Sequence, residues 1–190
     1  SGGQNTKEKC AEALCRIATE QGGRGVMIQQ GALSCCIKLG GEEATITPKT
    51  NELARHAIAK MLVTTNPGLL TATQRLGSVS PLLKFCKNHE STNLGQFECL
   101  LSLTNLLSGE NDVKNKFVNE GGIGIVNFLM FEDHEMVRRA ACECLSNLVT
   151  HPKMIEYFRN PEKIRIWVAF LRDYEEDFET ARAATSGLAM

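Results

Sequence analysis

One helical pattern recurs along this chain about every 42 residues, and this recurrence restricts the possible folds more than any other feature of the sequence. The clearest copy, residues 133–150, reads DHEMVRRAACECLSNLVT and repeats small or apolar residues in pairs one turn apart, as an amphipathic helix does. Four other stretches align with it, and their anchors are separated by 44, 45, 42 and 40 residues: Leu14, Ile58, Leu103, Leu145 and Thr185. A second ladder of shorter apolar stretches precedes the later copies, with anchors separated by 46, 44 and 41 residues: Leu33, Val79, Ile123 and Ile164. Two ladders that share one period of about 40–47 residues indicate an armadillo or HEAT solenoid.

The predicted fold is therefore an all-α, right-handed armadillo-repeat solenoid of about four to five repeats, each of three helices, with incomplete terminal repeats. The array is expected to fill residues 6–190. Residues 1–5, which begin Ser-Gly-Gly, are interpreted as an expression remnant or a disordered lead-in. No polar closing helix precedes Met190. Because solenoids need polar terminal repeats, we expect the chain to be part of a longer array.

Three local signals predict where helices begin and end. Asp133 is expected to be the N-cap of the helix over 133–150, because a carboxylate can accept from the free N–H groups of the first turn. The His-Pro pair at 151–152 is expected to end this helix, since proline disfavours helical geometry in the residue before it. Pro81 is placed in the first turn of a helix over 78–88, where proline is tolerated.

Composition and charge exclude several classes of protein. The chain is 43% hydrophobic and 23% charged, which is ordinary for a folded domain. Its formal net charge is −1, with 11 basic and 7 acidic residues in 1–95 and 10 and 15 in 96–190, so the concentrated basic face that nucleic-acid binding needs is not visible. No apolar run approaches the roughly 18–20 residues that span a bilayer, and we expect neither a membrane segment nor a membrane partner.

The eight cysteines are interpreted as free thiols rather than as a disulfide framework. Most lie inside the repeated helices where small apolar residues pack, and a buried cysteine behaves as a small hydrophobe. No secretory signal is recognisable. We therefore expect a reducing, cytoplasmic location.

A helical wheel separates the buried face of each repeated helix from an opposite face that is predicted to line a groove. In the two best-defined copies the residues of this opposite face are Leu94, Glu98, Leu101 and Asn105, and Met136, Ala140, Glu143 and Asn147. Plain solvent exposure is the simpler interpretation. Asparagine is unfavourable inside a helix, however, and it recurs at one repeat position 42 residues apart. The last helices of stacked repeats form the inner, concave wall of a solenoid, so this face is expected to meet a client.

The same register extends the groove to the other repeats, at Glu12 and Arg16, His56 and Lys60, and Ala183 and Gly187. The asparagine ladder is thus incomplete, because Arg16, Lys60 and Gly187 replace it. A mixed ladder of this kind suits a bulky or irregular client better than a regular extended peptide.

Several of these stretches resemble successive repeats of the UCS domain of the myosin-directed chaperones. They are FECLLSLTNLLS (97–108), FEDHEMVRRAACECLSNLV (131–149) and ETARAATSGLAM (179–190), with NPGLL (66–70) and VSPLLKF (79–85) in keeping with them. The similarity runs across most of 50–190, and the portion 97–149 is specific, because general armadillo repeats share only the Asn-Leu and small-residue positions.

The resemblance implies a fragment of a UCS-type domain that holds the motor domain of myosin in a groove while it folds or is protected, with a role in muscle development. In animal members a tetratricopeptide domain binds heat-shock chaperones such as Hsp90, and that domain and the final UCS repeats are expected to be absent from this chain. Family importance attaches to the positions of Phe97, Asn105 and Asn147. The Arg138-Arg139 pair also matches, and the wheel places Arg139 nearer the groove.

Signals for catalysis or for a cofactor are weak. QGGRGVMIQQG and EGGIGIVNF lack the third glycine of GxGxxG at the required place, and no predicted strand precedes them. The histidines are scattered, and no Cys/His spacing fits zinc. The acidic residues around His134 are better explained as complementing the dipole of a helix start. We predict a non-enzymatic protein with no metal and no cofactor.

The predicted function is non-covalent binding of a protein client, with the myosin motor domain as that client. Leu94, Leu101 and Met136 are expected to supply apolar contacts, while the amides of Asn105 and Asn147 pair with the client backbone. The alternative is a general armadillo adaptor that binds extended peptide motifs, as importin-like and catenin-like proteins do.

Overall fold

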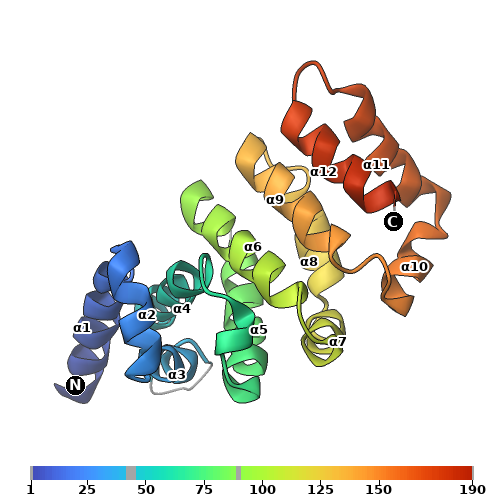
Figure 1. The fold of residues 1–190 in the computed structure, drawn as a ribbon. Helices are drawn as coiled ribbons and strands as arrows, with labels where there is room; N and C mark the ends of the chain where they lie inside the picture. Colours follow the sequence, from blue (N-terminus) through green and yellow to red (C-terminus); the bar gives the residue numbers. More distant parts are fainter. Residues whose placement is uncertain (1, 42–45, 89–90, 190) are drawn as a thin grey trace.

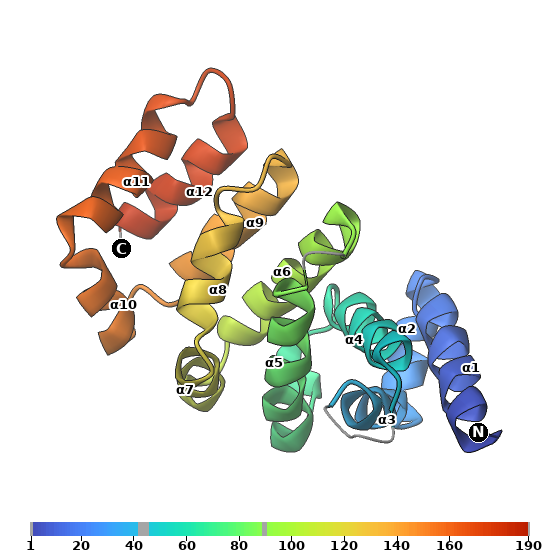
Figure 2. The same cartoon turned by 180° about the vertical axis from the view of Figure 1, so that it is seen from behind.

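The helices stack in sequence order in a computed structural model of the protein, so that the two chain ends lie at opposite ends of the array (Figure 1 and Figure 2). The structure describes residues 2–41, 46–88 and 91–189, and within these ranges it has twelve α-helices, one short 3-10 helix and no strand. The elements are α1 (Gly2–Ile17), α2 (Gln21–Gln29), α3 (Ala32–Leu39), α4 (Pro48–Leu62), η1 (Pro67–Leu69), α5 (Ala72–Cys86), α6 (Asn93–Leu107), α7 (Asn111–Asn119), α8 (Gly122–Leu129), α9 (Glu135–Ser146), α10 (Pro152–Phe158), α11 (Pro161–Arg172) and α12 (Phe178–Ala189). Residues 1–5 were predicted to be a disordered lead-in or an expression remnant, but α1 already begins at Gly2. Ser1 lies outside the described residues.

The helices that carry the first sequence ladder form one continuous layer. In this row α1 packs on α4, α4 on α6, α6 on α9 and α9 on α12. The helices of the second ladder, α3, α5, α8 and α11, pack behind α4, α6, α9 and α12 in turn. We call the side of the first row that is turned away from this second layer the inner face. The all-α solenoid predicted from the two ladders is confirmed.

One hydrophobic core runs through the array from α1 to α12. The three central anchors of the first ladder, Ile58, Leu103 and Leu145, are fully buried in it. The two outer anchors are not, because Leu14 is only partly buried and Thr185 is exposed. This anchor position is therefore fully buried only in the three central repeats, which have a neighbouring repeat on both sides.

The helix at the centre of the sequence analysis begins and ends at other residues than predicted. The prediction that Asp133 is its N-cap is wrong: His134 holds that position, and its side chain makes no capping bond. Arg138 donates to the carbonyl oxygens of Glu132 and Asp133 at 3.0 and 2.8 Å, which fixes the turn that enters the helix. The helix also ends at Ser146, before the His-Pro pair, and His151 instead caps α10.

The predicted place of Pro81 is also wrong, because it lies in the interior of α5 rather than in a first turn. Thr71 and Gln74 form a reciprocal capping box that starts this helix well before residue 78. Tertiary packing then outweighs the cost of an interior proline, since Pro81 is buried.

Two glycines make the same turn in two repeats. Gly31 and Gly121 directly precede α3 and α8 with φ of 82° and 79°, a left-handed conformation that only glycine adopts without strain. Each turn brings the second helix of a repeat back against the inner row.

Candidate functional site

All eleven side chains predicted to line the groove belong to α4, α6 and α9 or directly follow α9, and none of them is fully buried. They are His56, Lys60, Leu94, Phe97, Glu98, Leu101, Asn105, Met136, Arg139, Glu143 and Asn147. Leu94 and Met136 are 62% and 42% exposed. Phe97 and Leu101 are partly buried against the core.

The two asparagines connect successive inner helices. Asn105 Nδ2 donates to the carbonyl oxygens of Leu62 and Val63 at 3.1 and 2.7 Å, where α4 ends and its last carbonyls have no helical partner. Asn147 Nδ2 donates in the same way to the carbonyl oxygen of Thr104 at 2.9 Å. The expectation that the Asn105 amide donates to a client is therefore corrected, because both of its N–H groups are already engaged by the preceding repeat.

Other residues of this repeat position also face the preceding helix. Lys60 Nζ donates to Thr19 Oγ1 at 2.9 Å. Gly187 is buried, and a Cβ added there would come within 2.5 Å of the Trp167 ring and 2.7 Å of Ser146 Oγ. Ala183 and Ala140, which were also assigned to the groove, are buried as well. This correction has a simple cause: a helical wheel gives the direction of a side chain but not where the next helix crosses.

His56 and Glu98 form an ion pair between α4 and α6. Their Nε2 and Oε2 atoms are 2.7 Å apart, and the imidazole lies 5.4 Å from the ring of Phe85. Burial lowers the pKa of His56, but hydrogen bonds with Cys15 and Glu98 outweigh burial and raise its pKa to about 9. The imidazole is therefore charged at neutral pH and is held within the array.

A network of opposite charges joins α9 to α12. Arg139 contacts Glu143 at 3.0 Å and Glu179 at 3.6 Å, and Arg182 contacts Glu179 at 2.8 Å and Glu143 at 3.8 Å. The neighbouring Arg138 instead pairs with Asp177 at 2.7 Å, just before α12 begins.

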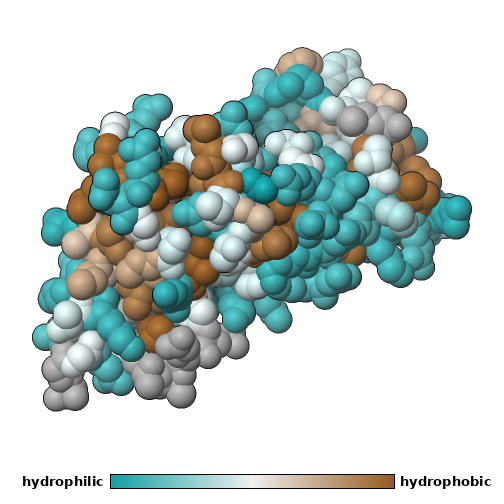
Figure 3. Space-filling model, turned by 60° about the horizontal axis from the view of Figure 1, so that its bottom comes forward, coloured by the Kyte–Doolittle hydropathy of each residue, from teal (hydrophilic) through white to brown (hydrophobic). Residues whose placement is uncertain are grey.

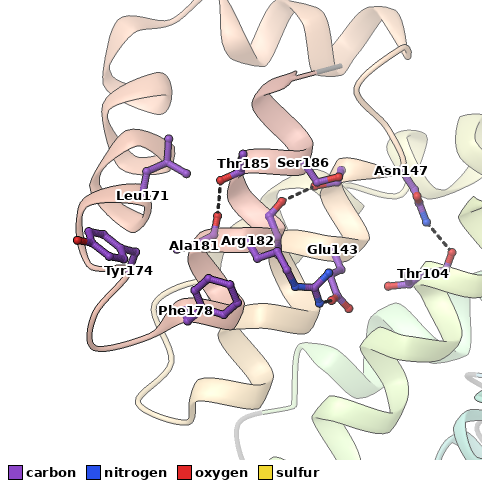
Figure 4. A pocket seen from close by; sticks show the side chains of 12 residues that line it. Thr104, Glu143, Asn147, Leu171, Tyr174, Phe178, Ala181, Arg182, Thr185 and Ser186 are labelled. Atoms are coloured by element: carbon purple, nitrogen blue, oxygen red, sulfur yellow. Dashed lines mark hydrogen bonds and ion pairs between the residues drawn. The ribbon is translucent and has the colours of Figure 1, made fainter.

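A groove with a volume of about 900 Å³ runs across α12 (Figure 4). From α9 it is lined by Glu143 and from the residue that follows α9 by Asn147, while Arg182 points toward Glu143 from α12. Its lining residues are Thr104, Glu143, Ser146, Asn147, Leu171, Tyr174, Phe178, Ala181, Arg182, Ala183, Thr185 and Ser186. A smaller pocket of about 160 Å³ next to it contains Met136, Arg139 and Phe178.

The groove thus brings together only part of the predicted site. The predicted residues on α4 and α6 lie outside it, whereas Glu143 and Asn147 line it. Sequence reasoning missed Tyr174 and Phe178, which are 55% and 62% exposed. Two aromatic residues within the acidic stretch DYEEDFE were the signal that could have found them.

A second exposed apolar surface lies at the other end of the array. Seen from below, apolar side chains gather over α1 to α3, while more of the remaining surface is hydrophilic (Figure 3). Ile17 and Val26, which are 49% and 58% exposed, line a groove of about 590 Å³ there.

The Cys142 thiol on α9 is buried. Burial raises the pKa of the Cys142 thiol to about 12, so the neutral thiol dominates at pH 7. Among the described residues, no cluster of three or more His, Cys, Asp or Glu side chains is placed to hold a metal ion. In the same part of the chain, no helix combines the length and the apolar character needed to cross a membrane.

Comparison with known proteins gives a consistent set of similarities. No family model matches the chain. The chain is 32% identical over 186 residues to protein unc-45 homolog B of Xenopus laevis, which covers 97% of this chain and 20% of that protein. It therefore spans about a fifth of the length of the curated relatives that it matches.

Solved structures agree with this similarity. UNC-45 from Drosophila melanogaster superposes with a TM-score of 0.88 at 30% identity, covering 98% of this chain and 23% of that one. The myosin chaperone UNC-45 from C. elegans, crystallised with an Hsp90 peptide, gives a TM-score of 0.85 at 27% identity, covering 98% and 21%. A designed armadillo repeat protein shares the fold, with a TM-score of 0.63 at 19% identity and coverage of 96% and 74%.

Proposed function

The chain is homologous over most of its length to part of UNC-45, the myosin chaperone of the UCS family, and on this premise we propose that it is a non-enzymatic module that binds a protein client. The proposed client is the motor domain of myosin, held along the inner face of the array while it folds and assembles. The relatives supply the identity of the client, because one related structure is described as that of a myosin chaperone.

The observation that carries the proposal is the unbroken row of inner helices with large apolar side chains left in water. Leu94 on α6 and Met136 on α9 are exposed at matching places of two successive repeats. Apolar side chains gain about 25 cal/mol for each Å² that a partner removes from water. A partly folded client can supply such a partner at several repeats at once.

The mechanism requires no bond making or breaking. A protein that binds an exposed client surface lowers the free energy of the bound state and so reduces the population that aggregates. The relatives are not known enzymes, in agreement with a binding role.

Two parts of the proposal concern the larger protein. Because a C. elegans relative was crystallised with an Hsp90 peptide, we propose that heat-shock chaperones bind regions outside this chain. All eight cysteines are free thiols, which supports a reducing, cytoplasmic location.

A binding measurement with the myosin motor domain tests the function. The variant Leu94→Ser with Met136→Ser should weaken binding by about tenfold or more, because both side chains would be buried by the client. The matched control is Leu69→Ser with Ile155→Ser, which removes apolar side chains that are 80% and 45% exposed on other elements. Both double variants should melt as the unaltered chain does.

Two outcomes would contradict the proposal. One is a motor domain, native or partly unfolded, that does not bind the unaltered chain. The other is an equal loss of binding in the control variant. A peptide array separates the alternative function, since an armadillo adaptor would select short linear motifs and bind them as tightly as the whole motor domain.

A further inference from the structure

The groove across α12 combines an apolar lining with a charged rim. Leu171, Tyr174, Phe178 and Ala181 line it from α11, from the loop after it and from α12. Figure 4 shows Leu171, Tyr174 and Phe178 on one side of α12, with Glu143 and Asn147 on the other. At about 900 Å³ the groove has the size of pockets that enclose a ligand of several side chains.

Negative charge is in excess around this groove. The segment 173–179 reads DYEEDFE and carries five carboxylates in seven residues. Along α9, the last residue of α11, the α11–α12 loop and the first turns of α12, there are seven carboxylates and four guanidinium groups, an excess of three negative charges: Glu135, Glu143, Asp173, Glu175, Glu176, Asp177 and Glu179, against Arg138, Arg139, Arg172 and Arg182.

The ion pairs show where this excess is located. Arg138 neutralises Asp177, and the four-residue network of Arg139, Glu143, Glu179 and Arg182 balances itself. The remaining groups are the exposed carboxylates of Glu135, Asp173, Glu175 and Glu176 and the exposed guanidinium group of Arg172. Glu175 accepts a hydrogen bond from the Tyr174 hydroxyl at 3.0 Å, and Glu176 lines the small pocket beside Phe178. The unbalanced charge therefore sits next to the two exposed aromatic rings.

We propose that this groove binds a client segment in which a bulky apolar side chain lies next to lysine or arginine. The apolar side chain leaves water against Leu171 and Phe178, while the cation lies near aromatic rings and unpaired carboxylates, both of which attract it. An acidic client segment would be repelled by these carboxylates, and a neutral segment would gain no electrostatic attraction from them. This inference rests on the proposed function and specifies the chemistry of the client.

Synthetic peptides test the inference directly by fluorescence anisotropy. The probe is a short extended peptide with one tryptophan flanked by lysines. One companion peptide has glutamate in place of each lysine, and the other has alanine in place of tryptophan. The lysine–tryptophan peptide should bind at least about tenfold more tightly than either companion, and its binding should weaken as salt is raised.

Charge reversal in the protein locates the binding site. Glu175→Lys with Glu176→Lys should weaken the lysine–tryptophan peptide by about tenfold or more and should improve binding of the glutamate peptide. The matched control is Glu156→Lys with Glu162→Lys, which changes the net charge equally at exposed residues that do not line the groove. The control should leave both peptides nearly unaffected.

The results distinguish this inference from the proposed function. Two results would overturn the inference. One is equal affinity for the lysine and glutamate peptides, and the other is an equal loss of affinity for the lysine–tryptophan peptide in the control variant. If the motor domain still bound the unaltered chain and the Glu175/Glu176 variant equally well, the client-binding function would stand while the chemistry assigned to this groove would be wrong. Failure of the motor domain to bind any form would instead remove the proposed function.

Discussion

The two halves of the inner face use the same repeat positions for different purposes. Between α1, α4 and α6, polar side chains connect neighbouring helices, as the bonds of Lys60 to Thr19 and of Asn105 to two carbonyls show. Between α9 and α12 the equivalent position is Gly187, which has no side chain to donate, and the large groove lies there instead. A repeat position therefore does not define a role, because the length of the side chain decides whether it reaches the neighbouring repeat.

The halves also differ in charge. Residues 1–95 carry four more basic than acidic side chains, and residues 96–190 carry five more acidic than basic ones. Taken over all residues, the first half of the chain therefore favours anionic partners and the second half cationic ones.

The largest effect is expected from giving α12 the asparagine that its repeat position lacks. Gly187→Asn should destabilise the chain by about 3 kcal/mol, because its Cβ would come within 2.5 Å of Trp167. Urea unfolding measures the change. The control Gly124→Asn, on a helix position with nothing within 4 Å of the added Cβ, should change stability by less than about 0.5 kcal/mol. Equal stability of the two variants would show that the groove could accept a full ladder.

The asparagines themselves should differ between the halves. Asn105→Ala removes two bonds and should cost about 2 kcal/mol, whereas Asn147→Ala removes one bond and should cost about 1 kcal/mol. Asn93→Ala, at an exposed first position of α6, is the control. Chemical denaturation gives the values. If neither inner asparagine affected stability, their bonds to the preceding helices would have no energetic role.

The ion pairs of His56 and of Asp177 should lose their stabilising effect at opposite ends of the pH range. Because the pKa of His56 is raised to about 9, its contribution is complete below about pH 6.5 and is lost as pH rises through 9. His56→Gln should therefore destabilise by about 1 kcal/mol at neutral pH, since desolvation offsets much of the attraction, and by much less above the raised pKa. Melting temperatures across pH test this.

Asp177 gives the acid counterpart in the C-terminal half. Burial raises the pKa of Asp177, but bonds from Arg138 and Thr180 outweigh burial and lower it. Its contribution is present above the unfolded pKa and is lost as pH falls through the folded pKa. Asp177→Asn should thus destabilise at neutral pH and have little effect in strong acid. A constant effect across pH would mean that the charge of Asp177 contributes nothing.

The smallest effect is expected at Lys60. Its bond to Thr19 is exposed, so Lys60→Met should change stability by less than about 0.5 kcal/mol in denaturant. Ser102→Ala is the useful contrast, because that buried hydroxyl donates to the carbonyl oxygen of Ala59 in the same half of the array. A larger loss at Lys60 than at Ser102 would show that exposed connections contribute more than buried ones here.

The sequence was sufficient to predict the fold because periodicity reports which residues one helix buries. The anchors Ile58, Leu103 and Leu145 are fully buried as the ladders required. It was insufficient for the helix ends, since the Thr71 capping box and the Arg138 contacts that set them depend on local hydrogen bonds rather than on periodicity.

The site was predicted only in part for a similar reason. Glu143 and Asn147 do line the groove, and Leu94 and Met136 are exposed as expected. Asn105 was placed on the correct side of its helix, but its partner belongs to the crossing of two helices, which no single-helix pattern contains. Tyr174 and Phe178 were missed because neither belongs to the repeated stretches: Tyr174 lies in the loop after α11, and Phe178 is the first residue of α12.

The buried glycine at position 187 also determines how the array comes apart. The final layer lacks the asparagine bond to the preceding helix and is held by packing, by the ion pairs and by one bond from Ser146 to the Ala183 carbonyl, so heat or tension should detach it first. A bound client that contacts both α9 and α12 would replace the missing connection between these two helices. Binding of the client would then also stabilise the last helices of the array against detachment.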